Sequence, residues 1–236
     1  MTKVLMVLSE VGYTWDEVIL PWDEFRKAGV AVDFATPTGG PPKLDPLSIV
    51  VRPVRNLIGF GTAAKIAPET ALGLELQRAL ETILPLEGLN PQNYSAIFLA
   101  GGHGSLFDLN LNKTLHALIL AFHRQGKGVG ALCHAASTLA FVQEDGHSLV
   151  RDRLVTGFPT FQELFILRFG MIHPNFLPMP IWTGRELDKH SQKRGLGIRI
   201  AEFFNMGLAV RDGNISTGLG PKSGRNLARK MLEVVA

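Results

Sequence analysis

The hydrophobic and polar positions of the chain alternate between strand-like and helix-like spacing. Residues 3–8 form a continuous apolar run that is typical of a buried strand. Residues 16–28 carry apolar side chains at helical spacing, and Gly29 then stops the helix. Residues 30–35 have the pattern of a second strand. A strand, a helix and a strand in this order predict a βαβ unit with a parallel sheet and a right-handed crossover.

The same succession continues to the end of the chain and predicts a doubly wound α/β fold. Such a fold has a mostly parallel, flavodoxin-like sheet with helices on both faces. A hairpin through Asp212 and Gly213 joins the last two strands, and the helical stretch before it is expected to break near Gly195 and Gly197. The further predicted strands are residues 95–100, 127–132, 154–156, 208–210 and 215–217, and the further predicted helices are residues 69–84, 111–124, 135–142, 161–169, 186–204 and 221–235.

The length of 236 residues fits one domain, residues 1–236, and a hydrophobic content of 46% supports a large core. Two regions depart from the regular pattern, at about residues 40–90 and 158–205. They are rich in proline, glycine or bulky apolar residues. We expect both to be cap insertions over the carboxyl edge of the sheet.

The composition of the chain limits the cellular compartments and the classes of partner that we expect. No apolar run approaches the roughly 18 residues of a membrane helix, and the first residues lack the pattern of a secretory signal. A single cysteine excludes an intrachain disulfide and suits a reducing compartment, so we expect a cytoplasmic protein. The net charge is +3, and the excess of basic residues lies late in the chain. No aromatic stacking pattern accompanies these residues. We therefore expect solvated helix faces, with no nucleic acid or membrane as partner.

Cys133 stands at the corner between a predicted strand and a predicted helix. Such a bend exposes a nucleophile and tolerates only small neighbours, and Ala131 and Ala135 flank Cys133 at a distance of two residues. A helix N-terminus also lowers the pKa of a thiol from its free value of about 8.5. The alternative is an inert buried cysteine, because free cysteines are often buried.

Three segments should meet at the carboxyl edge of the sheet, where doubly wound folds bind ligands. They are residues 10–17, residues 101–104 and the pair Cys133 and His134. Gly101 and Gly102 allow a close backbone approach, so the amides of Gly102 and His134 are candidates for an oxyanion hole. A glycine pair after a strand can also be merely a tight turn.

His134 could accept the thiol proton if an acid orients its ring. Of the acidic residues downstream, only Glu163 begins a helix after a strand at the active edge; the others are Glu144, Asp145 and Asp152. Glu17 is a further candidate, because it lies where the first helix starts. Each of these carboxylates could instead be a surface group in a first helical turn. The remaining histidines show no paired ligand spacing, and we expect no metal site.

Together these segments resemble the ThiJ/PfpI superfamily, which has a class I glutamine amidotransferase-like fold, and within it the heat-shock chaperone and glyoxalase III branch. The resemblance implies that Cys133 is the nucleophile, that Glu17 hydrogen-bonds its sulfur and that His134 pairs with Glu163. We also expect Gly101 and His103 to contact the substrate. The matching segments are residues 17–21, 25–29, 32–37, 101–104, 131–134, 155–158 with Glu163, 212–213 and 217–218.

The resemblance implies a cofactor-free glyoxalase that converts methylglyoxal and water to lactate without glutathione, or a related deglycase or hydrolase. Its substrate would be a small aldehyde, and the protein would be a homodimer. A holdase-type stress chaperone is an alternative that would not need Cys133. A peptidase of the same superfamily is another. A glutamine amidotransferase needs a late His-x-Glu pair, whereas His190 is followed by serine and glutamine.

Overall fold

The computed structural model describes residues 2–45, 48 and 66–235. Its main sheet has the strand order β3-β2-β1-β4-β5-β9-β8, and within the described residues only the β8–β9 pair is antiparallel. This confirms the doubly wound, mostly parallel α/β fold. The strands are β1 (Lys3–Val7), β2 (Ala31–Thr36), β3 (Ile83–Pro85), β4 (Ala96–Leu99), β5 (Gly128–Leu132), β8 (Ala209–Asp212) and β9 (Ile215–Gly218).

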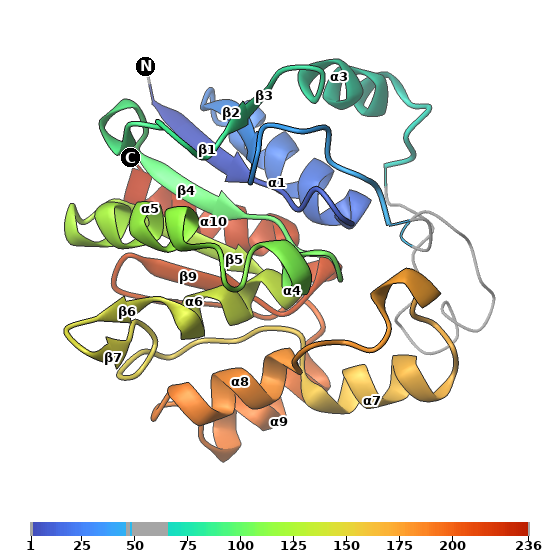
Figure 1. Ribbon diagram of the computed structural model, residues 1–236, viewed down its shortest axis with the longest axis vertical. Coiled ribbons are helices and arrows are strands. Elements are labelled where there is room, and N and C mark those ends of the chain that lie inside the picture. Colours follow the sequence, from blue (N-terminus) through green and yellow to red (C-terminus); the bar gives the residue numbers. More distant parts are fainter. Residues whose placement is uncertain (1, 46–47, 49–65, 236) are drawn as a thin grey trace.

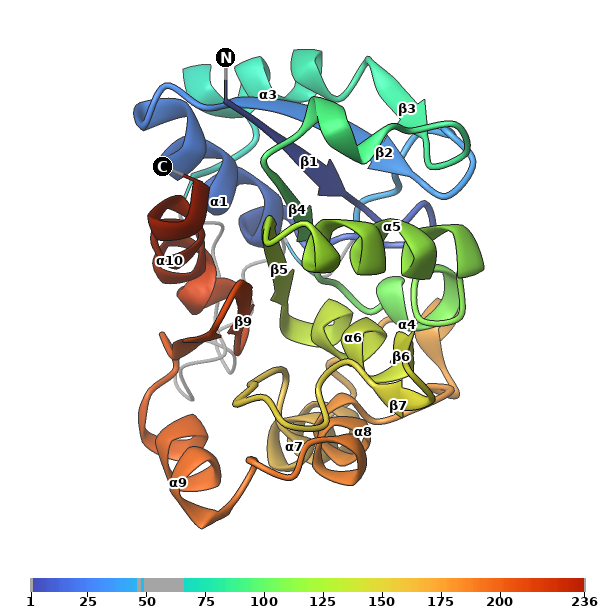
Figure 2. The ribbon, with the colours of Figure 1, turned by 90° about the vertical axis from the view of Figure 1, so that its left-hand side faces the viewer.

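Helices cover both faces of the sheet, as Figure 2 shows edge-on. On one face lie α1 (Trp15–Lys27), α3 (Ala71–Ala79) and α10 (Gly224–Val235), and on the other lie α5 (Lys113–Arg124) and α6 (Thr138–Phe141). The central strands therefore contribute side chains to two apolar cores. Phe98 of β4 packs with α1 and α10, whereas its neighbour Ile97 packs with α5. This two-sided burial explains why these strands are apolar without alternation.

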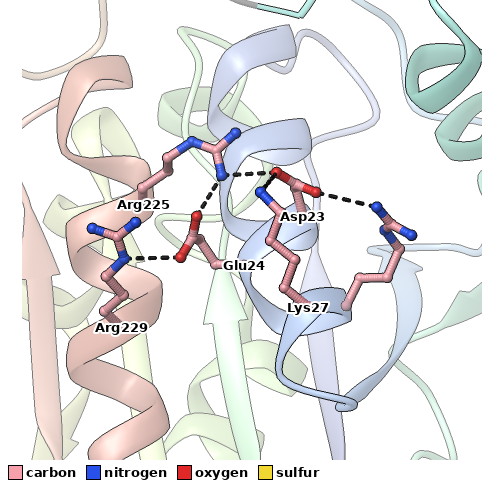
Figure 3. Close-up of polar contacts among 6 residues, drawn as sticks. Asp23, Glu24, Lys27, Arg225 and Arg229 are labelled. Carbon is pink, nitrogen blue, oxygen red and sulfur yellow. Dashed lines mark hydrogen bonds and ion pairs between the residues drawn. The ribbon is translucent and has the colours of Figure 1, made fainter.

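Ion pairs join α1 to α10 beside the core (Figure 3). The Asp23 carboxylate accepts a hydrogen bond of 2.8 Å from Arg225, and Glu24 accepts bonds from Arg225 and Arg229. Burial opposes ionisation of Asp23, but hydrogen bonds from Lys27 and Arg225 outweigh it and hold the pKa of Asp23 below its ordinary value. The first and last helices are thus fixed to each other near one end of the sheet.

Three predicted elements were wrong in extent or type. The helix predicted over residues 69–84 ends at Ala79, and residues 83–85 form the short edge strand β3. Residues 154–156 form no strand, because Leu154 and Thr156 donate their backbone N–H groups to the side chains of Asp212 and Thr217. The helix predicted over residues 135–142 begins as the 3-10 helix η3 (Cys133–Ser137) and continues as α6.

Further short elements lack a sequence signal of their own. They are α4 (Ser105–Asp108), the hairpin of β6 (Gln143–Glu144) with β7 (His147–Ser148), and the 3-10 helices η2 (Pro91–Asn93), η4 (Pro174–Phe176) and η5 (Pro221–Ser223). Two to four residues are too few to display a period.

The region 158–205 lies together at one end of the molecule (Figure 1). It holds α7 (Thr160–Arg168), α8 (Thr183–His190) and α9 (Leu196–Phe204), and the predicted break between α8 and α9 falls at residues 191–195, whereas Gly197 lies inside α9. Of the other predicted insertion, residues 40–90, residues 46–47 and 49–65 fall outside the described residues. No helix in the described parts of the chain is long and apolar enough to cross a bilayer.

A buried arginine ties α8 and α9 to the chain segment around Val155. Arg194 donates hydrogen bonds of 2.6 and 3.2 Å to the two carboxylate oxygens of Glu202, and one of 3.0 Å to the carbonyl of Val155. Asp188 accepts a further bond from its Nε at 2.9 Å. The planar guanidinium matches this arrangement, which an ammonium group cannot reproduce.

We expect Arg194→Lys to lower the free energy of unfolding by about 1–3 kcal/mol, because it leaves buried acceptors unpaired. Urea unfolding followed by circular dichroism measures this change. Arg199→Lys is the matched control, since Arg199 also contacts Asp188, at 3.2 Å, but its side chain is 56% exposed. The control should change stability by about 0.5 kcal/mol or less. Equal losses of stability in both variants would contradict the role assigned to the buried guanidinium group of Arg194.

Candidate active site

Cys133 occupies a strained bend directly after β5. Its φ angle is 57°, a left-handed conformation that costs a residue with a side chain about 1–2 kcal/mol. Ala131 and Ala135 on either side are fully buried, as the predicted bend requires. Such strain persists only where the surrounding structure enforces it, and it is concentrated at functional sites.

The three predicted segments converge on this bend. The N–H of Thr14 donates to the carbonyl of Gly101 at 3.1 Å, and the N–H of Gly104 donates to the carbonyl of Gly12 at 2.9 Å. A cavity of about 100 Å³ opens between them, a volume suited to a small molecule. Its lining includes Thr14, Glu17, Asp45, Ser48, His103, Cys133, His134, Phe158, Gln162, Ile166, Met171, Met206, Leu219, Gly220, Pro221 and Lys222.

Glu17 is buried against the nucleophile. Its carboxyl group contacts the Cys133 thiol and the backbone of Gly101, and burial raises the pKa of Glu17 to about 8. Burial also raises the pKa of the Cys133 thiol, and an ionised Glu17 raises it further, whereas the N–H of His134 lowers it. A Glu17 that keeps its proton removes this repulsion and can donate its O–H to the sulfur.

Gly101 lies behind the carboxyl group of Glu17 rather than among the described residues that line the cavity. A Cβ atom at Gly101 would lie 2.0 Å from Glu17 Oε2 and 2.5 Å from the carbonyl oxygen of Leu132. The glycine therefore makes room for the contact between Glu17 and the nucleophile. This gives Gly101 a packing role, whereas the sequence suggested substrate contact.

We expect Gly101→Ala to lower the free energy of unfolding by about 1–3 kcal/mol and to displace Glu17 from Cys133. Urea unfolding and the rate of Cys133 alkylation by iodoacetamide measure the two effects. Gly197→Ala is the control, because a Cβ there meets nothing within 4 Å. As a helical glycine, Gly197 should gain about 0.5–1 kcal/mol from alanine. Unchanged stability and alkylation in Gly101→Ala would show that the backbone relaxes freely at this position.

His134 contacts an acid indirectly. Its Nδ1 lies 3.1 Å from Thr183 Oγ1 and 3.6 Å from Glu163 Oε1, and the second distance is too long for a hydrogen bond. The backbone N–H of Thr183 in turn donates to Glu163 Oε1 at 2.7 Å. Thr183 thus bridges the ring and the carboxyl group. Sequence analysis missed Thr183, because a threonine in the first turn of a helix has no distinguishing signal.

Burial sets the ionisation of this group. It lowers the pKa of His134 well below the ordinary value of 6.5, and a charge on His103 lowers it further. Burial raises the pKa of Glu163 to about 8, although hydrogen bonds from Thr183 and Gly184 oppose this shift. The imidazole is therefore held neutral, the form that can accept a proton.

The structure brings Glu163 to His134 and leaves the other three acidic candidates elsewhere. Glu144 pairs with Arg124 at 3.1 Å, the Asp145 side chain is 90% exposed, and Asp152 is exposed.

Of the residues that carry the two predicted oxyanion-hole amides, His134 lines the cavity and Gly102 is not among the described lining residues. The N–H of His134 faces the sulfur of Cys133. Gly102 has a φ of 124°, and a Cβ there would lie 2.6 Å from the carbonyl oxygen of Gly12. The close approach of these two loops accounts for the glycine. Binding of a substrate oxygen by either amide stays a prediction.

His103 lines the cavity, as the predicted substrate contact requires. Its Nδ1 lies 3.0 Å from Asp45 Oδ2, and its ring stacks on Phe176 with the centroids 5.6 Å apart. Sequence analysis missed Asp45 and Phe176, since both come from irregular segments without a period. Within the described residues, no cluster of three or more His, Cys, Asp or Glu side chains could hold a metal ion.

The chemistry of this arrangement is nucleophilic and acid–base. The Cys133 thiol, an imidazole and the carboxyl group of Glu17 line one small volume, and the carboxyl group of Glu163 lies beside His134. These are the groups needed to attack a carbonyl carbon and to move protons around it.

Comparisons with known proteins agree with the fold. Residues 8–164 match the family model described as ThiJ/PfpI family-like. The chain is 27% identical to the glutathione-independent glyoxalase hsp3101 of Schizosaccharomyces pombe, over 98% of this chain and 95% of the relative. It is also 27% identical to the protein/nucleic acid deglycase HchA of Pseudomonas aeruginosa, over 93% and 73%. The crystal structure of glyoxalase III from Candida albicans superposes with a TM-score of 0.68 at 21% identity, over 99% and 97% of the two chains.

Proposed function

The chain belongs to the ThiJ/PfpI-like family, and from this premise we propose that it is a cofactor-free cysteine enzyme acting on small reactive carbonyls. Its reaction would be that of a glutathione-independent glyoxalase, which converts methylglyoxal and water to lactate; a related deglycase or hydrolase reaction is the nearest alternative. The observation that carries the proposal is the small cavity in which Cys133 meets Glu17 and His134. The similarity to hsp3101 over nearly the whole chain supports it.

The first step would be attack of the Cys133 sulfur on the aldehyde carbon. A C–S bond forms, the carbonyl electron pair moves to oxygen, and that oxygen takes a proton to give a hemithioacetal. His134 accepts the thiol proton, and Glu17 holds the sulfur in place. Thr183 and Glu163 orient the imidazole of His134 from behind. The N–H groups of Gly102 and His134 would stabilise the charge on oxygen.

The second stage is an internal oxidation and reduction that needs no external oxidant. A base removes the hydrogen of the former aldehyde carbon, and a proton is returned to the neighbouring carbon. The first carbon is thereby oxidised to a thioester and the second is reduced to an alcohol. Water then attacks the thioester, the C–S bond breaks, and lactate leaves. Glu17 and His134 are the candidates for the proton transfers at carbon.

Residues 158–205 would form a cap over this cavity, since Phe158, Gln162 and Ile166 contribute to its lining. The substrate is therefore selected by this region. The family resemblance extends the proposal to a homodimer, and the single cysteine of the sequence fits a place in the cytoplasm.

A second candidate function, a holdase-type chaperone, is favoured by the exposed apolar side chains of the same region. Large exposed apolar patches bind other proteins. The exposed side chains here are Phe161, Leu164, Leu167, Phe169, Leu177, Leu196, Ile200, Phe203 and Phe204.

The direct test is lactate formation from methylglyoxal by the purified, reduced protein without glutathione. We expect turnover by the unaltered chain, and a fall on the order of 10²-fold in Glu163→Gln, because the ring of His134 loses its oriented support. Glu144→Gln is the matched control and should keep full activity. Absence of turnover in the unaltered protein would refute the glyoxalase proposal, and full activity of Glu163→Gln would refute the role of this acid.

A further inference from the structure

His103 and Asp45 form a second histidine–carboxylate pair at the cavity. The Nδ1–Oδ2 distance is 3.0 Å, and the side chains are 12% and 3% exposed. The backbone holds the aspartate in place, because the N–H of Asp45 donates to the carbonyl of Tyr13 and the N–H of Tyr13 donates to the carbonyl of Lys43, both at 2.9 Å. The segment carrying Asp45 is therefore fixed against the loop that follows β1.

The other nitrogen of His103 is available to a ligand. Nε2 is buried, lies on a residue that lines the cavity, and has no hydrogen-bond partner among the described residues. A buried polar atom without a partner costs about 1–3 kcal/mol, so such an atom in a cavity indicates a site that a bound molecule completes. Since the carboxylate of Asp45 accepts the Nδ1–H, Nε2 can accept a proton and return it.

The ring of His103 cannot turn away from the cavity. It lies between the rings of His134 and Phe176, with centroid distances of 4.7 and 5.6 Å. Phe176 reaches this place only because residue 12 is a glycine, since a Cβ there would lie 2.3 Å from the Phe176 Cζ atom. Two imidazoles of fixed orientation thus face one small volume, and only His134 adjoins the nucleophile.

The proposed reaction requires proton transfer at oxygen as well as at carbon. When the hydrogen of the first carbon is removed, its electron pair forms a C–C double bond and the ketone electron pair moves to the second oxygen, which must gain a proton. When the second carbon is protonated, the first oxygen must lose its proton as the thioester carbonyl forms. One proton therefore leaves one oxygen and one arrives at the other, with no net change.

We propose that Nε2 of His103 carries this proton between the two substrate oxygens, and that Asp45 positions the ring for it. The inference rests on the proposed function and adds a second catalytic histidine to the site. It assigns the proton transfers at carbon to Glu17 and His134, which adjoin the sulfur. It assigns the proton transfers at oxygen to the imidazole of His103. The substrate class that such a pair serves is an α-oxoaldehyde, with oxygen atoms on adjacent carbons.

The test compares the steady-state kinetics of lactate formation from methylglyoxal in His103→Ala, His103→Gln, Asp45→Asn and Asp45→Glu. We expect both His103 variants to lower kcat by about 10²–10³-fold with KM changed by about threefold or less. Added imidazole should restore turnover in His103→Ala in proportion to its concentration. Asp45→Asn should lower kcat by about 10-fold or more, and Asp45→Glu should recover part of the loss. Circular dichroism and alkylation of Cys133 identify any variant that fails to fold.

His123→Gln is the matched control, because His123 also faces a carboxylate, Glu144 at 3.5 Å, but is not part of the cavity lining. It should keep the kcat of the unaltered protein. An unaltered kcat in both His103 variants, or a folded His103→Ala that imidazole does not restore, would overturn the relay while leaving the proposed function intact. An unaltered protein without turnover would overturn the proposed function and the relay together.

Discussion

Replacing Cys133 by alanine should reduce lactate formation by on the order of 10⁴-fold or more. Loss of a nucleophile removes the covalent intermediate, and effects of this size accompany such losses in other covalent enzymes. Cys133 is the only cysteine of the sequence, so no other thiol of the chain can substitute for it. Enzymatic detection of lactate, after incubation with methylglyoxal and without glutathione, measures the loss.

The same variant separates the two candidate functions. Alanine keeps a side chain at φ 57°, so the backbone strain remains and the stability should change by about 1 kcal/mol or less. Suppression of the aggregation of a heat-denatured client protein should persist if the exposed side chains of α7 and α9 act as a holdase. If Cys133→Ala kept the turnover of the unaltered protein, the nucleophile would be another group, and the role assigned to Cys133 would be wrong.

The parts of the site that lie on regular elements could be predicted from the sequence. Cys133 follows a central strand between two small residues, and Glu17 and Gly101 follow neighbouring strands. Parallel strands bring their carboxyl ends to one edge, so a parallel sheet predicts that these residues lie together. The prediction depends on a correct reading of the apolar runs, which are long and continuous in strands buried on both faces.

The residues that the sequence did not reveal reach the site through irregular chain. Asp45 and Phe176 lie in segments without a period, and Thr183 approaches His134 only through the packing of α8 beside η3. Their positions depend on contacts between residues far apart in the sequence, 32 positions for Asp45 with Tyr13 and 49 positions for His134 with Thr183. The same reason explains residues 154–156, whose N–H groups are satisfied by the distant side chains of Asp212 and Thr217 rather than by a strand.

The buried carboxyl groups of the site should make the protein less stable as pH rises above neutrality. Burial raises the pKa of Glu17 and of Glu163 from 4.5 to about 8 in the folded protein. Between these values the folded state binds more protons than the unfolded state, so the free energy of unfolding falls with rising pH. The slope approaches about 1.4 kcal/mol per pH unit for each group.

Histidines oppose this trend at lower pH. Burial lowers the pKa of His134 and of His116 below 6.5, so the unfolded state binds more protons there and stability rises with pH up to about 6.5. The contribution of the two histidines levels off over roughly the next pH unit, as the unfolded state loses its remaining histidine protons. A comparison of a carboxyl variant with the unaltered protein between pH 6.5 and 8 cancels this contribution and isolates the effect of the replaced carboxyl group.

Glu17→Gln should consequently remove about half of the fall in stability between pH 6.5 and 8, and should make the variant more stable than the unaltered protein at pH 8 by several kcal/mol. The neutral amide keeps the shape of the protonated carboxyl group but has no proton to lose. Urea unfolding at pH 6.5, 7.25 and 8 measures the slope, with Glu75→Gln on the exposed surface of α3 as the control that should leave it unchanged. A Glu17→Gln slope equal to that of the unaltered protein would mean that Glu17 ionises equally easily in the folded and unfolded states. The stabilised variant should also lose turnover, because the group that destabilises the fold is the one that holds the sulfur of Cys133.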